Sequence, residues 1–302
     1  MAQTFEDFEL IAVDDGSSDR SWEILQEVSD KRVRTFGFPQ NRGIAVVRSY
    51  GVEQADCEYL AFLDADDIAA PARLQIQVSC LDSRADLGAV ASRAWILDSD
   101  GMRKQPFEHL QPDEVSATLL FRNCIVLSSV MIRRQEWQPQ RADFQVAADY
   151  ELWARLTPQL RFGLLKRALV TYRDHSSGNS KRRSGRMIEA IGKIHQEQLE
   201  RLGLHPNLDL HGMLSAWPAD VSFEKLGEAE LWLRNIIRAN RIYDPPSLRR
   251  VIELLWFRIC LDSWLLGPRA FHIYRRSALA RLTPVRMVRF LRRFGKRALT
   301  GR

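Results

Sequence analysis

Three acidic side chains follow a short apolar run near residue 60. The apolar stretch 59–63 leads directly into Asp64, Asp66 and Asp67. Because the stretch is too short for an independent helix, it predicts a buried strand in a largely parallel sheet. Ligands bind at the carboxyl edge of such sheets, and carboxylate oxygens suit Mg²⁺ or Mn²⁺. The triplet alone is equally typical of a solvated turn or a helix cap, so its chemistry depends on its surroundings.

A second acidic turn follows another apolar run close to the amino terminus. Asp14 and Asp15 end that run, and Gly16 supplies the backbone freedom of a tight turn. Ser18 or Asp19 can cap the helix that is predicted to follow. The same pattern is found in ordinary connections between a strand and a helix, and that alternative stays open.

Two further segments place polar residues at the start of predicted helices. Asn41 and Gly43 precede a predicted helix over residues 44–54, which carries Arg48 one turn in. Asp149 lies at the start of another amphipathic segment. A metal ion held by the acidic triplet would neutralise a diphosphate in their neighbourhood.

In combination, these segments resemble the family 2 glycosyltransferases, which adopt the GT-A fold. The resemblance rests on residues 13–19, 41–48, 64–66, 148–153 and 172–175. Ala148 departs from the pattern, because it stands where the family carries the first acid of a Glu-Asp-x-x-Leu-Trp element. The resemblance covers residues 1 to about 180. It implies an α/β domain of the GT-A type, Rossmann-like, with a mostly parallel sheet flanked by helices.

The resemblance also implies an activity. Members of the family transfer a sugar from a nucleotide-diphospho-sugar to a hydroxyl acceptor with inversion at the anomeric carbon, and we expect the same here. The acceptor would be a saccharide or a lipid-linked precursor of a surface polysaccharide or glycolipid. The matching residues for the nucleotide-sugar are Asp15, Arg48 and Asp64, and those for a divalent metal are Asp66 and His175.

Asp149 matches the position of the general base. A carboxylate there can take the proton of the acceptor hydroxyl as it attacks, so no covalent nucleophile is required. Glu151 falls on a different side of the predicted helix and is interpreted as a surface or supporting group. Leu152 and Trp153 are predicted to belong to the core.

One departure concerns the amino terminus. Family members carry a further strand and helix ahead of the segment that here occupies residues 3–9. On that comparison a central strand is lacking, so we expect unpaired strand edges and place the activity of these residues in doubt. A catalytically impaired remnant that binds nucleotide-sugars is therefore an alternative interpretation. A second alternative is a membrane-associated binding protein whose basic carboxyl-terminal tail is its main activity.

Composition fits an enzyme with an appended segment. The 302 residues are 45% apolar, which is enough for one large core or two modest ones. No stretch is long and apolar enough to predict a spanning helix, and the acidic start is unlike a signal peptide. The four cysteines lack paired or metal-like spacing, so we expect reduced thiols in a cytoplasmic protein. No Gly-x-Gly-x-x-Gly or Gly-Lys-Ser/Thr loop occurs, which disfavours dinucleotide oxidoreductases and phosphate-loop nucleotidases.

Positive charge is concentrated at the carboxyl terminus. We expect a helical extension over residues 181–266 and a basic amphipathic tail over 267–302. The tail has eleven lysines and arginines and no acid, so the rest of the chain is net negative although the whole has a balance of +6. Such a helix suits an anionic membrane surface, which would make the protein peripheral at the inner face of the membrane. The alternatives are a helix that packs its apolar side on the protein and, less favoured for want of a recognition motif, a nucleic-acid-binding tail.

Overall fold

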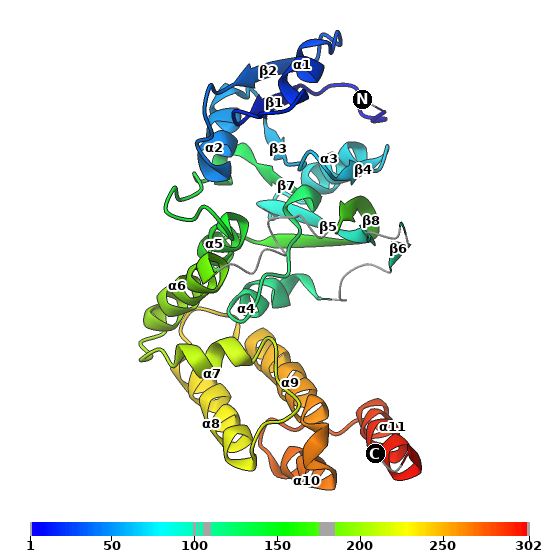
Figure 1. Ribbon diagram of the computed structural model, residues 1–302, viewed down its shortest axis with the longest axis vertical. Coiled ribbons are helices and arrows are strands. Elements are labelled where there is room, and N and C mark those ends of the chain that lie inside the picture. Colours follow the sequence, from blue (N-terminus) through cyan, green and yellow to red (C-terminus); the bar gives the residue numbers. More distant parts are fainter. Residues whose placement is uncertain (1, 99–100, 102, 105–109, 175–184, 301–302) are drawn as a thin grey trace. The chain divides into compact units, whose positions relative to one another are not determined.

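The chain folds into two compact units (Figure 1). The computed structural model describes residues 2–98, 101, 103–104, 110–174 and 185–300. The first unit contains residues 1–115 and 124–191, and the second contains 116–123 and 192–302. Segment 116–123 belongs to the second unit although the segments before and after it belong to the first. No change of composition marks this segment. The predicted boundaries near residues 180 and 266 remain predictions.

The amino-terminal sheet consists of two parallel strands, β1 (Leu10–Asp14) and β2 (Val33–Gly37). Helix α1 (Ser21–Gln26) lies in the crossover between them, since parallel strands cannot be joined by a tight turn. Helix α2 (Ile44–Gln54) packs against β1 and has the predicted bounds. Because Asp14 pairs with Gly37, both strands end at the same edge.

A second sheet has six strands in the order β3-β7-β5-β8-β4, with β6 added beside β5. Helix α3 (Arg73–Ser83) packs on β5. The strands are β3 (Tyr59–Ala61), β4 (Ile68–Ala69), β5 (Ala89–Leu97), β6 (Arg103–Lys104), β7 (Val130–Arg133) and β8 (Phe162–Arg173).

The prediction of a mostly parallel sheet is wrong for this second sheet. Only β5 and β8 run parallel among its described pairs, and the other pairs are antiparallel. An apolar run predicts that a strand is buried but says nothing about its direction. Direction follows from the connections between strands. β5 and β8 can run parallel because a long segment of the chain, which includes β7 and helix α5 (Ala148–Leu156), connects them.

Among the described residues, β1, β2, β3 and β4 each pair with a single neighbour and leave an open edge. β1 pairs only with β2, and β3 pairs only with β7. Leu63, which follows β3, is 46% exposed.

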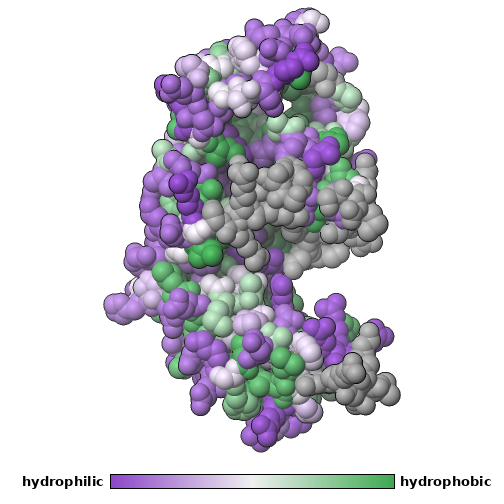
Figure 2. Space-filling view, viewed as in Figure 1, coloured by the Kyte–Doolittle hydropathy of each residue, from purple (hydrophilic) through white to green (hydrophobic). Residues whose placement is uncertain are grey.

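The second unit is helical. Its core includes Trp256, Leu233 and Leu199, which are fully buried. In Figure 2, hydrophilic residues cover most of the visible surface of the first unit, whereas a green patch lies over α9. No described helix in either unit is long and apolar enough to cross a membrane. The longer helices are α6 (Gly185–Arg201), which begins in the first unit, α8 (Phe223–Ala239), α9 (Pro245–Asp262), α10 (Pro268–Arg276) and α11 (Pro284–Thr300); the shorter ones include α4 (Val115–Leu119) and α7 (Leu208–Met213).

Candidate active site

The turn after β1 holds the start of helix α2. The Asp15 carboxylate accepts hydrogen bonds from the amides of Arg42 at 2.7 Å and Gly43 at 3.0 Å. Gly16 has a φ of 70°, and a Cβ there would lie 2.7 Å from the carbonyl carbon of Gln40. Only glycine therefore allows the two loops to approach this closely. Asp15, which the resemblance assigns to the nucleoside, has a structural role at the helix start in this arrangement.

Helix α2 carries Arg48 to the acidic loop. The Arg48 guanidinium donates to the Asp64 carboxylate at 2.6 Å. The arginine side chain is 14% exposed and the aspartate side chain 39%. The structure thus brings together two residues that the sequence places in separate motifs. Helix α2 contacts both the loop after β1, through Asp15, and the loop after β3, through Arg48.

The acidic loop is also tied to the end of β8. The Asp67 carboxylate accepts a hydrogen bond from the Arg173 amide at 2.9 Å, and the Arg173 Nε donates to the Asp66 carbonyl at 3.0 Å. On the other side, the Asp64 amide donates to the buried Ser128 hydroxyl at 2.9 Å. The side chain of Asp66 is left exposed. The loop is therefore fixed at both ends while its middle carboxylate faces solvent.

Two charged residues at the acidic loop, Asp67 and Arg73, are buried. Burial raises the pKa of the Asp67 carboxyl, and the nearby charges of Asp64 and Asp66 raise it further. Beneath the loop, Arg73 is 2% exposed, and burial lowers its pKa to about 10. Its guanidinium donates to the carbonyls of Phe62 and Val130, which fastens the end of β3 to β7.

Sequence reasoning misses Arg73 and Ser128. Neither belongs to a motif, and an arginine at the start of a predicted helix is ordinarily solvent-exposed. Their roles follow from contacts between segments that are separated in the sequence. Arg73 bonds Phe62, which is 11 residues away, and Ser128 bonds Asp64, which is 64 residues away. The pattern of the sequence contains no local signal for such contacts.

Helix α5 positions Asp149 in its first turn, where the side chain is partly buried. The preceding residue, Ala147, has a φ of 56°, a left-handed conformation that costs energy for a residue other than glycine. Trp153 is fully buried against Phe162, as predicted for a core residue.

The interpretation of Glu151 as a surface group is wrong. Its side chain is only 3% exposed, and it accepts hydrogen bonds from Arg155 at 2.7 Å and 3.3 Å. Arg141 lies 3.9 Å from the same carboxylate. A buried carboxylate requires such partners, and its burial places Glu151 on the side of α5 that faces the protein. The supporting interpretation of Glu151 agrees with this contact.

The acidic loop offers donor atoms of the kind that a divalent metal prefers, but the described residues do not form a complete coordination sphere. Asp64 and Asp66 offer carboxylate oxygens, which hard cations prefer, although Asp64 is engaged with Arg48. In the described part of the chain, no group of three or more His, Cys, Asp or Glu side chains is arranged to hold a metal. Mg²⁺ is commonly held by one or two carboxylates together with substrate phosphates, so the donor set fits that mode. His175, the second predicted ligand, lies outside the described residues.

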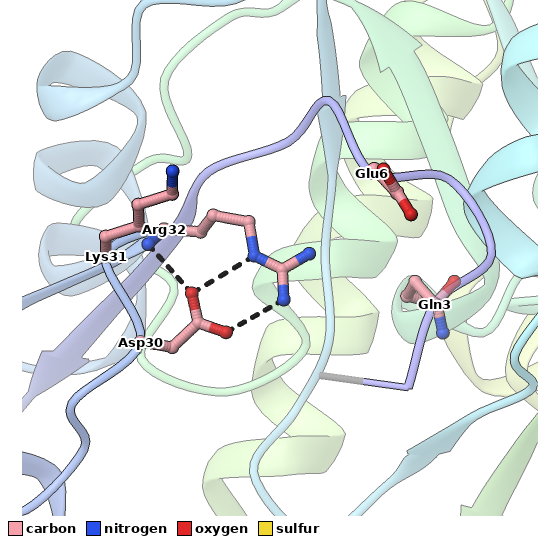
Figure 3. Close-up of a pocket in the computed structure, with 5 residues that line it drawn as sticks. All are labelled: Gln3, Glu6, Asp30, Lys31 and Arg32. Carbon is pink, nitrogen blue, oxygen red and sulfur yellow. Dashed lines mark hydrogen bonds and ion pairs between the residues drawn. The ribbon is translucent and has the colours of Figure 1, made fainter.

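Two cavities lie apart from these residues. One of about 580 Å³ is lined by residues near the amino ends of β1 and β2, opposite the edge that carries Asp15 (Figure 3). In it, Asp30 accepts two hydrogen bonds from the Arg32 guanidinium, at 3.1 Å and 2.8 Å, so these charges satisfy each other. The other, of about 320 Å³, lies in the second unit beside His272. Neither is lined by a predicted site residue.

Comparison with known proteins identifies a family for the region that carries the acidic loop and helix α2. Residues 1–136 match the sequence model of glycosyl transferase family 2. The amino-terminal region is a family 2 glycosyltransferase domain. The match includes the positions of Asp15, Arg48 and Asp64. It ends before Asp149, so the assignment of the base is independent of it.

Relatives of this glycosyltransferase domain occur in bacteria and archaea. An uncharacterised glycosyltransferase of Haemophilus influenzae is 27% identical over 65% of this chain and 66% of that protein. The O-antigen biosynthesis glycosyltransferase WbnJ of Escherichia coli is 25% identical over 59% of this chain and 73% of its own. The chain spans 32% of the length of a second H. influenzae relative and 62% of the length of one from Methanocaldococcus jannaschii.

A solved structure shares the fold. S. aureus TarS, residues 1–349, superimposes with a TM-score of 0.54 and 14% sequence identity, covering 100% of this chain and 85% of that structure. At this level of identity the likeness concerns the fold alone. It agrees with an α/β glycosyltransferase domain of the GT-A type followed by a helical region.

Proposed function

We propose that the protein transfers a sugar from a nucleotide-diphospho-sugar to a hydroxyl acceptor during the biosynthesis of a surface polysaccharide or glycolipid. The observation that carries the proposal is the connected arrangement of Arg48, the acidic loop and the end of β8, within a family 2 domain. Names of relatives support the pathway. They include the O-antigen enzyme WbnJ and a UDP-Glc:alpha-D-GlcNAc-diphosphoundecaprenol beta-1,3-glucosyltransferase, WfgD, both from E. coli.

The donor end of the reaction needs positive charge and a fixed loop. Loss of the diphosphate concentrates negative charge, which the Arg48 guanidinium can balance from α2. In this proposal Asp66, whose side chain is exposed, and His175 hold a divalent cation, and Asp64 contacts the nucleotide-sugar. A cation bound there would neutralise the departing diphosphate. Asp15 keeps the start of α2 in place next to the nucleoside.

The acceptor end needs a base. Asp149 takes the proton of the acceptor hydroxyl, which attacks the anomeric carbon from the side opposite the diphosphate. The new bond to the acceptor oxygen forms as the bond to the diphosphate breaks, so a single displacement inverts the anomeric configuration. Arg155, which pairs with Glu151 on the same helix, also donates to the Pro139 carbonyl at 3.0 Å and so ties the helix that carries Asp149 to the preceding segment.

Nucleotide binding tests the donor site. Calorimetric titration with uridine, guanosine and deoxythymidine diphosphates, with and without Mn²⁺, should give metal-dependent binding of one of them. Asp66→Ala should abolish the metal-dependent part, whereas Asp220→Ala, which removes an exposed carboxylate in the second unit, should not. A folded protein that binds none of the three in either condition would contradict the proposal.

Turnover separates an enzyme from a binding protein. Asp149→Asn should leave nucleotide binding intact and reduce sugar transfer by about two to four orders of magnitude, the usual contribution of a general base. Unchanged transfer would remove Asp149 from the mechanism. Nucleotide binding without transfer to any acceptor tried would favour the nucleotide-sugar-binding alternative.

A further inference from the structure

Helix α11 has two different faces. Its inner face contains Arg286, Phe290 and Arg293, which recur at intervals of four and three residues. Phe290 is 2% exposed, and its ring centroid lies 5.3 Å from that of Phe257. The Arg286 guanidinium lies 5.1 Å from the centre of the Phe257 ring. This face accounts for the attachment of α11 to α9.

The other face leaves apolar side chains in solvent. Val285, Val288 and Leu291 recur every three residues and are 65%, 44% and 69% exposed. Met287, between these residues and Phe290, is 43% exposed, and Leu282 just before the helix is 50% exposed. Exposed apolar residues that adjoin one another in this way commonly mark an interaction surface.

Arginines lie beside and among these apolar side chains. Arg289 and Arg292 lie one turn after Val285 and Val288, on the side of the helix away from Phe290, and both are exposed. Residues 267–302 contain no aspartate or glutamate, so nothing in this segment neutralises them. A surface on which exposed apolar side chains and arginines lie side by side complements a partner that is apolar inside and negative outside.

We propose that the outer face of α11 is a docking surface for an anionic lipid bilayer. Val285, Val288 and Leu291 enter the boundary between headgroups and acyl chains, while Arg289 and Arg292 contact anionic headgroups. Nucleic acid would use the arginines but leave the apolar row without a function. The proposal concerns attachment and is independent of the chemistry at Asp66 and Asp149.

Vesicle flotation tests the proposal with the full chain. The protein should float with vesicles that contain phosphatidylglycerol and remain unbound with vesicles of phosphatidylcholine alone. Val288→Ser combined with Leu291→Ser should weaken binding at least tenfold. Leu231→Ser is the matched control, because Leu231 is 56% exposed on α8 of the same unit, and it should leave binding unchanged.

Charge variants complete the test. Arg289→Gln and Arg292→Gln should each lower affinity roughly fivefold, as expected for one arginine at an anionic surface. Arg238→Gln and Arg241→Gln, exposed positions on and after α8, serve as charge controls. Thermal unfolding should show that all variants are folded, since none of these residues is buried.

Three results would overturn the proposal. One is equal binding to neutral and anionic vesicles. The second is absence of vesicle binding together with arginine-dependent binding to duplex DNA that the serine variants do not alter. The third is a dimer in sedimentation velocity that the Val288→Ser and Leu291→Ser changes dissociate while vesicles remain unbound, which would assign the face to a second copy of the chain.

Discussion

The three carboxylates of the acidic loop differ in how their charge is balanced. Asp64 has an arginine partner, Asp67 is buried and bonded to a backbone amide, and Asp66 extends into solvent. Burial is the main cause of the raised pKa of Asp67, and the charges of Asp64 and Asp66 raise it further. Asp66 is the most exposed of the three residues.

Arg48 offers a test at the level of a single residue. Arg48→Gln removes the positive charge beside Asp64, so we expect nucleotide diphosphate affinity to fall about tenfold, which corresponds to about 1.4 kcal/mol. Stability should change by less than about 1 kcal/mol, because Asp64 is well exposed. Isothermal titration and thermal unfolding measure the two effects.

A matched control is available for this variant. Arg20→Gln breaks an exposed pair with Glu23 and should alter neither nucleotide affinity nor stability. If Arg48→Gln behaves like Arg20→Gln in both measurements, Arg48 lies outside the donor site.

At the level of elements, the site depends on how α2 is attached at both ends. Asp15 bonds the amides at its start, and Arg48 joins its second turn to the loop after β3. Both contacts require the turn after β1 to pass close to the backbone at Gln40. A defect in this turn should therefore affect the acidic loop, although the turn is not part of that loop.

Gly16→Ala tests this dependence. The new methyl group would meet backbone atoms at 2.7 Å and the residue would keep a φ of 70°, so we expect a loss of roughly 2 kcal/mol or more in the free energy of unfolding. Urea unfolding measures the loss. Gly227→Ala, inside α8 with open space around the new Cβ, should instead stabilise by about 0.5–1 kcal/mol. Equal effects of the two changes would show that the turn has room to relax.

At the scale of the whole molecule, the two units should respond differently to acid. The core of the second unit contains His195 and His211, whose pKa values burial lowers to about 3 and about 4. His211 accepts a hydrogen bond from the Trp232 indole and contacts the Leu120 carbonyl, an arrangement that selects the neutral ring with its proton on Nε2. Protonation of either ring therefore requires the core to open.

The sign of the pH effect follows from these lowered values. Between about pH 6.5 and 4 the unfolded histidines bind protons and the folded ones do not, so stability falls as pH falls, on the order of 2 kcal/mol per histidine at pH 5. The raised pKa of Asp67 acts in the opposite direction in the first unit, because the folded state there binds a proton more readily. Urea unfolding at pH 7 and pH 5 should show the helical unit weakening more.

Replacement of the histidines checks their part in this effect. His195→Gln combined with His211→Gln should remove most of the difference between pH 7 and pH 5 in the helical unit, even though the variant is less stable at both. A pH dependence that survives both substitutions would have to arise elsewhere.

Much of the local structure could be predicted from the sequence. The helix over residues 44–54 forms with the predicted bounds, since its start signal at Gly43 and its composition agree. The strands before Asp14 and Asp64 form where the apolar runs predict them, although β3 ends at Ala61. The family resemblance is confirmed for residues 1–136, and the burial of Trp153 is as predicted.

The sequence by itself determined where the turns, helices and acidic loops lie, because these depend on propensities and side chains within a few residues of one another. Only the tertiary structure decided the antiparallel direction of β3 and β7, the pairing of Arg48 with Asp64, and the burial of Arg73 and Glu151. Each of these is a contact between distant segments, and its free energy depends on burial and geometry that no local pattern specifies. The same holds for α11, whose amphipathic sequence predicts a helix, whereas packing against Phe257 decides which of its faces remains free.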